Sequence, residues 1–530
     1  MRRVIEADVC IIGSGISAAM VAERLARSPK PHHVVVLEAG DDVPPLSNRY
    51  SLRARERAYG ENPWPNDHLE GYDIEGPLQS RSMCVGGLAM HWGGVTPRFS
   101  PEDFRVRSLF GVGHDWPVSY EALEPDYQAA EEILGVAGEQ GPSAMDPRAK
   151  SFPMPALPLT YNLTLLKDWA DKAGITMWSQ PSAKNSVPYA GRAPCCRNDT
   201  CSPVCPIGAK YSPDFTWTAL RAGKTVRLVT RTLVRRLILE NGTSRVSHAV
   251  AVQRDQPRDI LEVHAKQFVV AGGYVWSAHL LLLSAQPGAP NGLGNRSGLV
   301  GKYLTGHRNV QAFIALPIAL YPGINEQHSL VTKQFMRVTP ADTGGKYVRH
   351  DLRVWESATG RGARLTNDSG TLMLGDEILR DWRSRTKTGV ARVRAYYDVI
   401  PDRSSELTLD TSRRNDWGDP LPKLRFRDDP ASVELRPFAE QRIRDLFARM
   451  ARAGGGTVTR TSVDEFQDHP AGGCRMGDDP ETSVVDSHGR SHDHENLWVV
   501  GAPTSVSGGC ANATLTFCAL ALRAAARMAS

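Results

Sequence analysis

The sequence lacks several features that would assign it to common functional classes. It has no run of 18 apolar residues, so no membrane-spanning helix is expected. It has no dense Lys/Arg stretch with interleaved aromatic residues, and a net charge of +5 is small for 530 residues, so nucleic-acid binding is not indicated. It also has no internal repeat and no long low-complexity tract. With 41% hydrophobic and 23% charged residues, the composition is that of an ordinary globular protein.

The N-terminus leaves little room for a targeting segment. Met1-Arg2-Arg3 leads almost directly into the strand-like run Ala7-Asp8-Val9-Cys10-Ile11-Ile12, so no signal peptide is expected. The default expectation is a cytoplasmic location. Export together with a partner subunit that carries the signal stays open as an alternative.

Cysteine is sparse except in one place. Four of the nine cysteines lie within eleven residues, namely Cys195, Cys196, Cys201 and Cys205. Soft thiolates in a Pro-rich loop suit an iron–sulfur centre. Zinc is less suited, because it wants four ligands and the adjacent Cys195 and Cys196 would not both reach one tetrahedral ion. Two structural disulfides or inert free thiols are the alternatives, and the spacing does not choose between them.

The chain begins with a β-α-β pattern. Residues 8–12 predict a buried strand, 13–27 a helix and 34–38 a second strand, which is how a doubly wound parallel sheet starts. Strand character returns at 226–230, 237–239, 249–252 and 268–270, followed by a helix over 275–284. Strand-like stretches at 393–400 and 406–410 indicate an antiparallel sheet with helices. The last 35 residues predict a strand at 497–500, a Gly/Ser-rich loop and a helix over 513–528.

These patterns predict an α/β fold with an α+β second domain. A Rossmann-like nucleotide-binding domain spans 1–308, with Pro- and Cys-rich insertions at 42–80 and 140–215 that we expect to be irregular. A substrate-binding domain built on an antiparallel sheet with helices spans 309–464. Residues 465–530 return to the first domain, so the two domains are interleaved.

The turn after the first strand is a nucleotide-binding motif. Gly13-Ser14-Gly15-Ile16-Ser17-Ala18 matches G-x-G-x-x-A between a strand and a helix. The first glycine allows a tight turn, the second lets the backbone approach a pyrophosphate, and the small third residue lets helix and strand pack closely. The helix N-terminus then directs free N–H groups at the phosphates.

Glu38 ends the second strand, where a carboxylate accepts a hydrogen bond from a ribose 2′-OH and disfavours a 2′-phosphate. NADP is therefore not expected. The motif alone does not separate FAD from NAD, and Glu38-Ala39-Gly40 favours FAD.

Beyond this point the sequence resembles the glucose–methanol–choline (GMC) oxidoreductase family. Five segments carry the resemblance in family order along nearly the whole chain. They are residues 13–40, Val85-Gly86-Gly87-Leu88-Ala89-Met90-His91-Trp92, Ala271-Gly272-Gly273, His469-Pro470-Ala471-Gly472-Gly473-Cys474-Arg475-Met476-Gly477, and Asn512-Ala513-Thr514-Leu515-Thr516.

The resemblance implies FAD and a polyhydroxylated substrate, a sugar, glycoside or polyol. Within the family, the segment Cys195 to Ala209 is similar to that of bacterial FAD-dependent glucose dehydrogenase catalytic subunits, in which the residues matching Cys195, Cys201 and Cys205 ligate a 3Fe-4S cluster. That likeness implies a cytochrome, quinone or other acceptor and a small chaperone or signal-bearing subunit. Thr96-Pro97-Arg98-Phe99 is similar to pyranose 2-oxidase and C-glycoside 3-oxidases, which implies O2 as acceptor.

Oxidation of an alcohol needs a base for the O–H proton and a donor that holds the oxygen. In the family context His469 is the expected base and Asn512 the expected partner, at the N-terminus of the last helix, whose positive end would stabilise an anionic reduced flavin. The alternatives are a capped surface histidine and a helix N-cap asparagine. His307 is interpreted as structural.

Further cofactor contacts follow from the same resemblance. His91 either carries the flavin covalently or only contacts it, and both readings stay open. The expected cofactor-binding residues are Gly13, Ser14, Gly15, Ala18, Glu38, Ala39, Gly86, Gly87, His91, Trp92, Val234, Ala271, Gly501, Ala502 and Thr514.

The leading functional prediction is an FAD-dependent sugar or polyol dehydrogenase with an iron–sulfur relay. The first alternative is a soluble oxidase that reduces O2 to peroxide. A flavin-holding lyase or assembly subunit without redox turnover is the second.

Overall fold

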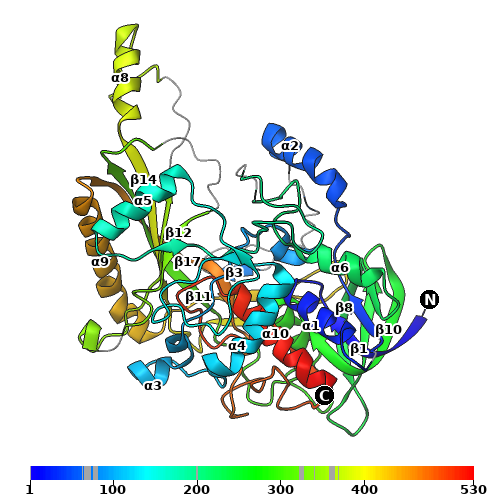
Figure 1. Cartoon of the computed structure of the whole chain (residues 1–530). Helices are drawn as coiled ribbons and strands as arrows, with labels where there is room; N and C mark the ends of the chain where they lie inside the picture. The colour runs from blue at the N-terminus through cyan, green and yellow to red at the C-terminus, as the bar shows by residue number, and fades with distance from the viewer. Residues whose placement is uncertain are drawn as a thin grey trace.

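The computed structural model describes residues 2–30, 32–61, 64, 73–75, 82–197, 201–320, 328–338, 341–356, 364–367 and 369–530. Two large sheets organise this part of the chain (Figure 1). One has seven strands and lies beside both chain termini. The other has six strands and lies beneath helices α5 (Tyr161–Lys172) and α9 (Pro430–Ala453). This arrangement confirms the predicted fold class.

The seven-stranded sheet contains the predicted β-α-β start. The order is β7-β2-β1-β10-β9-β8, with β18 paired to β10, and β1 runs parallel to both β2 and β10. Every residue of β2 is buried, as expected for a parallel strand covered on both faces. The strands are β1 (Arg2–Ile12), β2 (Val34–Leu37), β7 (Val226–Val229), β8 (Thr232–Leu239), β9 (Val246–Gln253), β10 (Gln256–Val270) and β18 (Leu497–Val499).

Five helices pack around this sheet and on one another. The last helix, α10, packs against α1 and α4, and ten of its residues are buried. The helices are α1 (Ile16–Ala26), α4 (Tyr120–Leu134), α6 (Pro213–Arg221), α7 (Gly273–Leu283) and α10 (Thr514–Ala529). Chain beginning and chain end therefore form one hydrophobic core around the first sheet.

The six-stranded sheet is antiparallel, in the order β17-β11-β14-β13-β12-β6. Its own core lies between the strands and helices α5 and α9. The strands are β6 (Trp178–Ser179), β11 (Thr305–Leu316), β12 (Leu330–Thr332), β13 (Leu352–Glu356), β14 (Gly389–Asp398) and β17 (Thr457–Ala471). The edge strand β6 and helix α5 come from the predicted insertion 140–215, so this layer draws on chain outside 309–464.

The predicted irregular segments contain more regular structure than expected. The segment 42–80 includes helix α2 (Arg49–Tyr59), whose Arg, Ala, Leu and Glu residues are strong helix formers. Strand β3 (Asp73–Glu75) pairs with β16 (Pro420–Arg425), and β16 pairs with β15 (Glu406–Arg414) in a separate sheet. The remaining elements are η1 (Leu46–Asn48), η2 (Gly87–Met90), η3 (Pro101–Phe104), α3 (Val106–Phe110), β4 (Ala137–Gly138), β5 (Met154–Pro155), η4 (Ala341–Thr343) and η5 (Ala502–Thr504).

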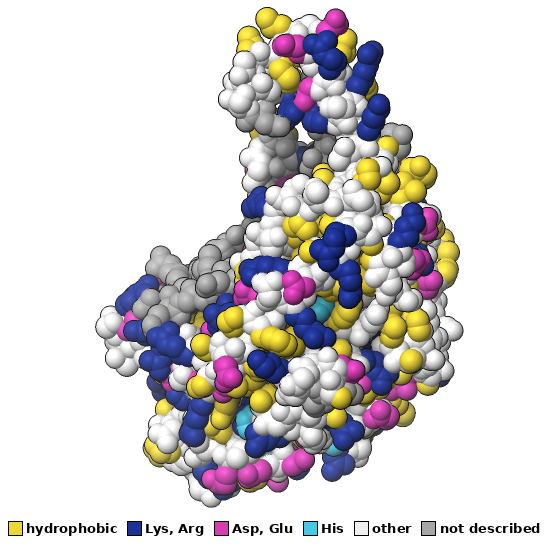
Figure 2. Space-filling view, turned by 90° about the vertical axis from the view of Figure 1, so that its left-hand side faces the viewer, with side chains coloured by type: hydrophobic (Ala, Val, Ile, Leu, Met, Phe, Trp, Pro, Cys, Tyr) yellow, Lys and Arg dark blue, Asp and Glu magenta, His cyan; other side chains and the backbone are white. Residues whose placement is uncertain are grey.

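One arm projects from the six-stranded layer. It ends in helix α8 (Asp376–Thr386), which stands away from the body in Figure 1 and has no buried residue. Figure 2 shows apolar and basic side chains mixed on this projection. Its exposed large apolar residues are Leu365, Leu372, Leu374, Leu379 and Trp382. In the described part of the chain we find no helix with the length and apolar character needed to span a bilayer.

A buried ionic network joins α4 to the segments before and after it. The carboxylate of Glu131, which is fully buried, accepts hydrogen bonds from Nε and Nη2 of Arg98 at 2.9 and 3.0 Å and from Nη2 of Arg148 at 2.6 Å. Glu131→Ala would leave two buried guanidinium groups without this partner, so we expect it to lower the free energy of unfolding by about 3–5 kcal/mol.

Urea denaturation followed by circular dichroism measures this loss. The control is Glu495→Ala, which breaks the exposed ion pair with Arg245 and is expected to cost only about 0–1 kcal/mol. Equal, small effects of both substitutions would contradict the prediction.

Candidate active site

The G-x-G-x-x-A turn connects β1 to α1 at the middle of the parallel sheet. Gly13 has φ +96°, and a Cβ on it would lie 2.7 Å from the carbonyl oxygen of Ala271 at the end of β10. Its N–H donates to the carbonyl oxygen of Leu37 at 2.8 Å. Ala18 is fully buried where α1 meets the sheet. The turn is thus as tight as the sequence predicts.

The N-terminus of α1 fits a pyrophosphate. Gly15 is the N-cap residue, and no side chain caps the free N–H groups of the first turn. A Cβ on Gly15 would meet no heavy atom within 4 Å, so open space lies in front of this helix end. Free N–H groups and the positive end of the helix dipole favour a phosphate there.

The carboxylate of Glu38 follows β2 and lies directly beside this turn. It accepts hydrogen bonds from the backbone N–H and the hydroxyl of Ser14 at 2.9 and 2.6 Å, and from the N–H of Gly40 at 2.7 Å. Burial raises the pKa of the Glu38 carboxyl, and these three donors oppose that effect. Ala39 lies between Glu38 and Gly40, whose carboxylate and N–H form the last of these hydrogen bonds. The residues therefore fit a dinucleotide whose ribose reaches the end of β2.

A second glycine turn faces the first one. The N–H of Gly86 donates to the hydroxyl of Ser14 at 3.1 Å. A Cβ on Gly87 would lie 3.7 Å from Cα of Gly15. Both Gly86 and Gly87 have positive φ, at +93° and +55°. Two segments that are far apart in sequence thus present bare backbone to the same space.

The remaining predicted cofactor residues surround this region. The N–H of Ala271 donates to the carbonyl oxygen of Ile12 at 2.8 Å, and a Cβ on Gly501 would lie 2.6 Å from the hydroxyl of Ser17 in α1. Ala502 begins η5, and Thr514 begins α10. Val234 is buried in β8, two residues after Thr232, whose N–H donates to the Glu38 carbonyl oxygen at 2.8 Å.

The structure brings His469 and Asn512 together. Nδ2 of Asn512 lies 2.6 Å from Nε2 of His469, and Nδ1 of His469 lies 2.8 Å from Nε2 of His307. Oδ1 of Asn512 is buried and has no hydrogen-bond partner among the described residues. A hydroxyl group placed beside the pair could donate its proton to Nε2 while accepting from the amide.

Backbone geometry explains why these side chains meet. His469 has φ +57°, in the left-handed region, at the end of β17. Gly508 lies so close to the carbonyl oxygen of Gly306 that no Cβ fits, which brings the loop before α10 against the start of β11. The N-cap of α10 is Ala513, with no side-chain cap. The alternative reading of Asn512 as a helix cap is therefore wrong.

His307 is the contact that the sequence did not reveal. It is fully buried in β11, and β11 pairs with β17 so that His307 lies in register with residue 468. The sequence alone indicates a structural role for it, because His307 follows the family-like turn Val300-Gly301-Lys302-Tyr303-Leu304. Only the pairing of two strands that lie far apart in sequence places it beside His469.

The loop that contains Cys201 and Cys205, and residues 210 and 211 that follow it, are hydrogen-bonded to the segment that contains His91 and Trp92. The hydroxyl of Ser202 donates to the carbonyl oxygen of His91 at 2.6 Å, and the indole N–H of Trp92 donates to the carbonyl oxygen of Tyr211 at 2.8 Å. Nζ of Lys210 donates to the carbonyl oxygen of Trp92, also at 2.6 Å. These contacts thus hold the backbone of His91 and Trp92 in place.

The thiols themselves are all free, and the disulfide alternative is not seen. Cys195, Cys201 and Cys205 are near enough to interact electrostatically: burial raises the pKa of the Cys195 thiol, and the charges of the other two raise it further. Among the described residues, however, no three His, Cys, Asp or Glu side chains are arranged to hold a metal ion. The described side chains therefore do not show the 3Fe-4S cluster that the resemblance implies, and the cluster stays a prediction.

Comparison with known proteins agrees with this geometry. Family models described as GMC oxidoreductase match residues 188–309 and 401–521. The chain is 31% identical to the fructose dehydrogenase large subunit of Gluconobacter japonicus, over 98% of this chain and 97% of that protein. It is 30% identical to 6'''-hydroxyparomomycin C oxidase of Streptomyces lividus, over 99% of this chain and 91% of that protein.

The fold is shared with solved flavoenzyme structures. Pyridoxine 4-oxidase from Mesorbium loti superposes with a TM-score of 0.64 at 20% identity, and the alignment covers 98% of each chain. The nucleotide-binding turn, the fold and the full-length relatives agree, and the chain therefore belongs to the GMC oxidoreductase family and is an FAD-dependent oxidoreductase that acts on CH–OH groups.

Proposed function

We propose that this enzyme oxidises a hydroxyl group of a sugar or polyol, with His469 as the base and Asn512 as the group that holds the substrate oxygen. The observation that carries the proposal is the 2.6 Å contact between Nδ2 of Asn512 and Nε2 of His469 at the N-terminus of α10. An amide donor and an imidazole acceptor side by side are what a reacting alcohol oxygen requires.

Other residues of the chain bind the cofactor and stabilise the charge that develops in the reaction. The α1 N-terminus and Glu38 hold the dinucleotide, and the glycine turn at Gly86 and Gly87 leaves room for it. FAD, when bound, supplies the acceptor for the hydride. The N-terminus of α10 places a positive dipole end next to the reacting groups, which favours negative charge that develops there.

The substrates named for the relatives support a polyhydroxylated substrate. One relative is a fructose dehydrogenase large subunit, and a third, 28% identical over 98% of this chain and 94% of its own length, is the 2-methyl-1,2-propanediol dehydrogenase of Mycolicibacterium austroafricanum. Fructose and a diol both carry neighbouring hydroxyl groups. We therefore propose a sugar or polyol rather than a simple alcohol.

For the electrons, we propose an external acceptor on a partner subunit, because a large subunit implies a smaller one. Molecular oxygen is the second candidate acceptor, because another relative is an oxidase. The three-iron cluster is not part of the proposal, because the described cysteines do not form a metal-holding group.

Anaerobic mixing of the FAD-loaded protein with a panel of sugars and polyols tests the function. We expect at least one of them to bleach the flavin absorbance, since a hydride reaches the flavin only from a bound CH–OH group. No bleaching by any member would refute the sugar or polyol substrate and favour a role without redox turnover. Rapid peroxide formation in air would favour molecular oxygen as the electron acceptor. Iron at about three atoms per FAD would support the three-iron cluster.

A further inference from the structure

We infer that His307 and His469 form a histidine dyad, in which His307 positions the base and shares its positive charge after proton transfer. The inference depends on the proposed function and deepens it. It starts from two contacts of His469: Nδ1 lies 2.8 Å from Nε2 of His307, and Nε2 lies 2.6 Å from Nδ2 of Asn512. Both ring nitrogens of His469 are thus engaged by side chains of known chemistry.

The donor and acceptor roles follow from the amide. Nδ2 of Asn512 carries two hydrogens and only donates, so Nε2 of His469 must accept. In a neutral imidazole one nitrogen accepts and the other carries the proton, so the proton of His469 is on Nδ1 and is donated to Nε2 of His307. This tautomer leaves the Nε2 lone pair on the side where a substrate hydroxyl would meet Asn512.

His307 is held firmly enough to impose this orientation. Its side chain is fully buried in β11, and its ring packs on the ring of Tyr396 with centroids 4.3 Å apart. Tyr396 also contacts the ring of His469 edge-on, at 5.8 Å. The pairing of β11 with β14 and β17 fixes the backbone of His307, and burial and the packing on Tyr396 restrict its ring.

Charged groups of both signs surround the dyad. Arg353 and Arg394 lie over the Tyr396 ring, 5.3 and 4.2 Å from its centroid, and Arg353 pairs with Asp351 at 2.8 Å. Asp398 is the register partner of His307 across β11 and β14, so the two residues share a face of the sheet. An added positive charge on the dyad therefore has carboxyl groups as well as guanidinium groups near it.

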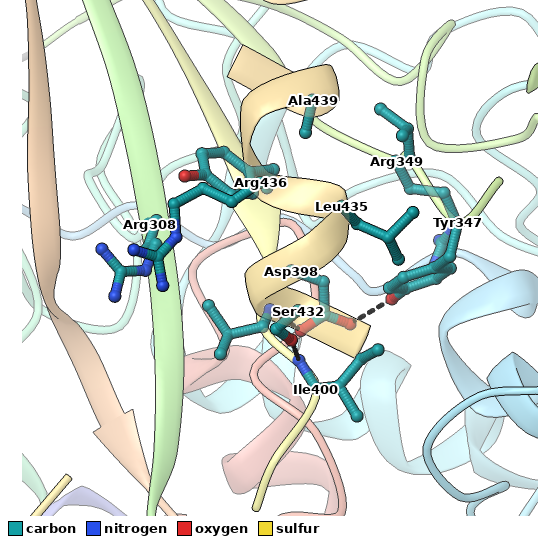
Figure 3. A pocket seen from close by; sticks show the side chains of 12 residues that line it. Arg308, Tyr347, Arg349, Asp398, Ile400, Ser432, Leu435, Arg436 and Ala439 are labelled. Carbon is teal, nitrogen blue, oxygen red and sulfur yellow. Dashed lines mark hydrogen bonds between the residues drawn. The ribbon is translucent and has the colours of Figure 1, made fainter. Parts of the chain in front are cut away.

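A small cavity lies beside Asp398, the register partner of His307. Figure 3 shows this cavity, with Arg308, Tyr347 and Asp398 on its walls and the Tyr347 hydroxyl directed at the Asp398 carboxylate, 2.6 Å away. The cavity measures about 20 Å³, which is room for a water molecule and not for a sugar or a flavin. Burial raises the pKa of Asp398 to about 6. His469 and Asn512 do not line this cavity, so it is not the space in which a substrate would meet them.

The dyad takes up the proton that leaves the substrate hydroxyl. The O–H bond of the substrate breaks and its proton goes to Nε2 of His469. FAD, when bound, would supply the acceptor for the C–H hydrogen and its electron pair, so that the alcohol would become a carbonyl. The imidazolium that forms on His469 donates its Nδ1 proton to Nε2 of His307, so the positive charge is spread over two rings. A hydrogen bond to the charged form of a base stabilises that form.

Two substitutions separate positioning from proton sharing. His307→Leu removes the acceptor, whereas His307→Gln keeps an oxygen that accepts a hydrogen bond and takes up no proton. We expect flavin reduction to slow about 100-fold in the first and about 10-fold in the second, with substrate dissociation constants unchanged within about twofold. The rate rises with pH as His469 loses its proton. In His307→Leu this rise should shift to lower pH, because the His469 imidazolium has lost a stabilising acceptor and its pKa falls.

The matched control is His328→Gln, another buried histidine, at the β12–β6 edge of the same sheet, whose Nε2 lies 3.0 Å from the hydroxyl of Ser179. It should leave both rate and pH profile unchanged. A His307→Leu enzyme that reduces its flavin at the wild-type rate with the wild-type pH profile would overturn the dyad. If the wild-type flavin is reduced by no sugar or polyol, the proposed function fails instead.

A measurement on the unmodified protein covers the case in which His307→Leu does not fold. Nitrogen-15 NMR of histidine-labelled full-length protein, with His469→Ala to assign the signal, reports which ring nitrogen of His469 carries the proton. We expect protonated Nδ1 and unprotonated Nε2 at neutral pH. The opposite tautomer would overturn the inference, because Nε2 would then offer no lone pair to the substrate.

Discussion

His469→Ala is expected to slow reduction of bound FAD by substrate about 10²- to 10⁴-fold, the usual contribution of a general base. The FAD content should match that of the wild type, because the Gly13–Ala18 turn and Glu38 hold the dinucleotide, whereas His469 contacts His307 and Asn512. Anaerobic stopped-flow spectroscopy at saturating substrate measures the rate, and added imidazole should restore part of it by replacing the missing ring.

The control is His248→Gln. His248 lies on β9, half-buried against the ring of His264, in the other sheet, and its loss should leave the rate unchanged. A His469→Ala enzyme that retains more than about a tenth of the wild-type rate would show that another group takes the proton.

Gly15→Val is expected to abolish FAD binding without unfolding the protein. Its Cβ would meet no protein atom within 4 Å, and φ is −62°, which any residue adopts. The added side chain would instead fill the space where the backbone must approach the pyrophosphate, so FAD affinity should fall about 100-fold or more. Flavin absorbance after purification and FAD titration of the apoprotein measure the loss, and thermal melting of the apoproteins should show equal stability.

Gly40→Ala gives the matched contrast. A Cβ at Gly40 would overlap the backbone of Met83, so this smaller substitution must displace the chain itself. We expect a lower melting temperature already in the absence of FAD. A lower melting temperature of Gly15→Val without FAD would contradict the prediction, because it would show that the protein fold itself requires glycine at this position.

Local patterns were enough to predict the parts of the fold that depend on neighbouring residues. The β-α-β start, the glycine turn and the last helix were placed within a few residues, because strand and helix periodicities and the G-x-G-x-x-A spacing are properties of short segments. Helix α2 was missed because the Pro, Arg and Asn content of 42–80 outweighed the helix-forming run inside it.

The site was predicted only where a family motif marked it. His469 and Asn512 belong to such motifs, and the structure places them 2.6 Å apart. His307 carries no motif, and its contact with His469 spans 162 residues of sequence. Such a contact depends on the register of β11 against β17, including its irregularities, and register between distant strands is not encoded in either strand alone.

The pairing of β1 with β10 has a consequence for how the enzyme is made. Arg2 and its partner Glu262 are 260 residues apart, so the first strand leaves the ribosome long before its neighbour exists. At about 5–20 residues per second the wait lasts from roughly ten seconds to a minute, during which the apolar Val9–Ile12 segment has β2 as a partner on one side but not β10 on the other. Asn512 is translated after His307 and His469, so a polypeptide released before it would contain the nucleotide-binding turn and the base without the amide that holds the substrate oxygen.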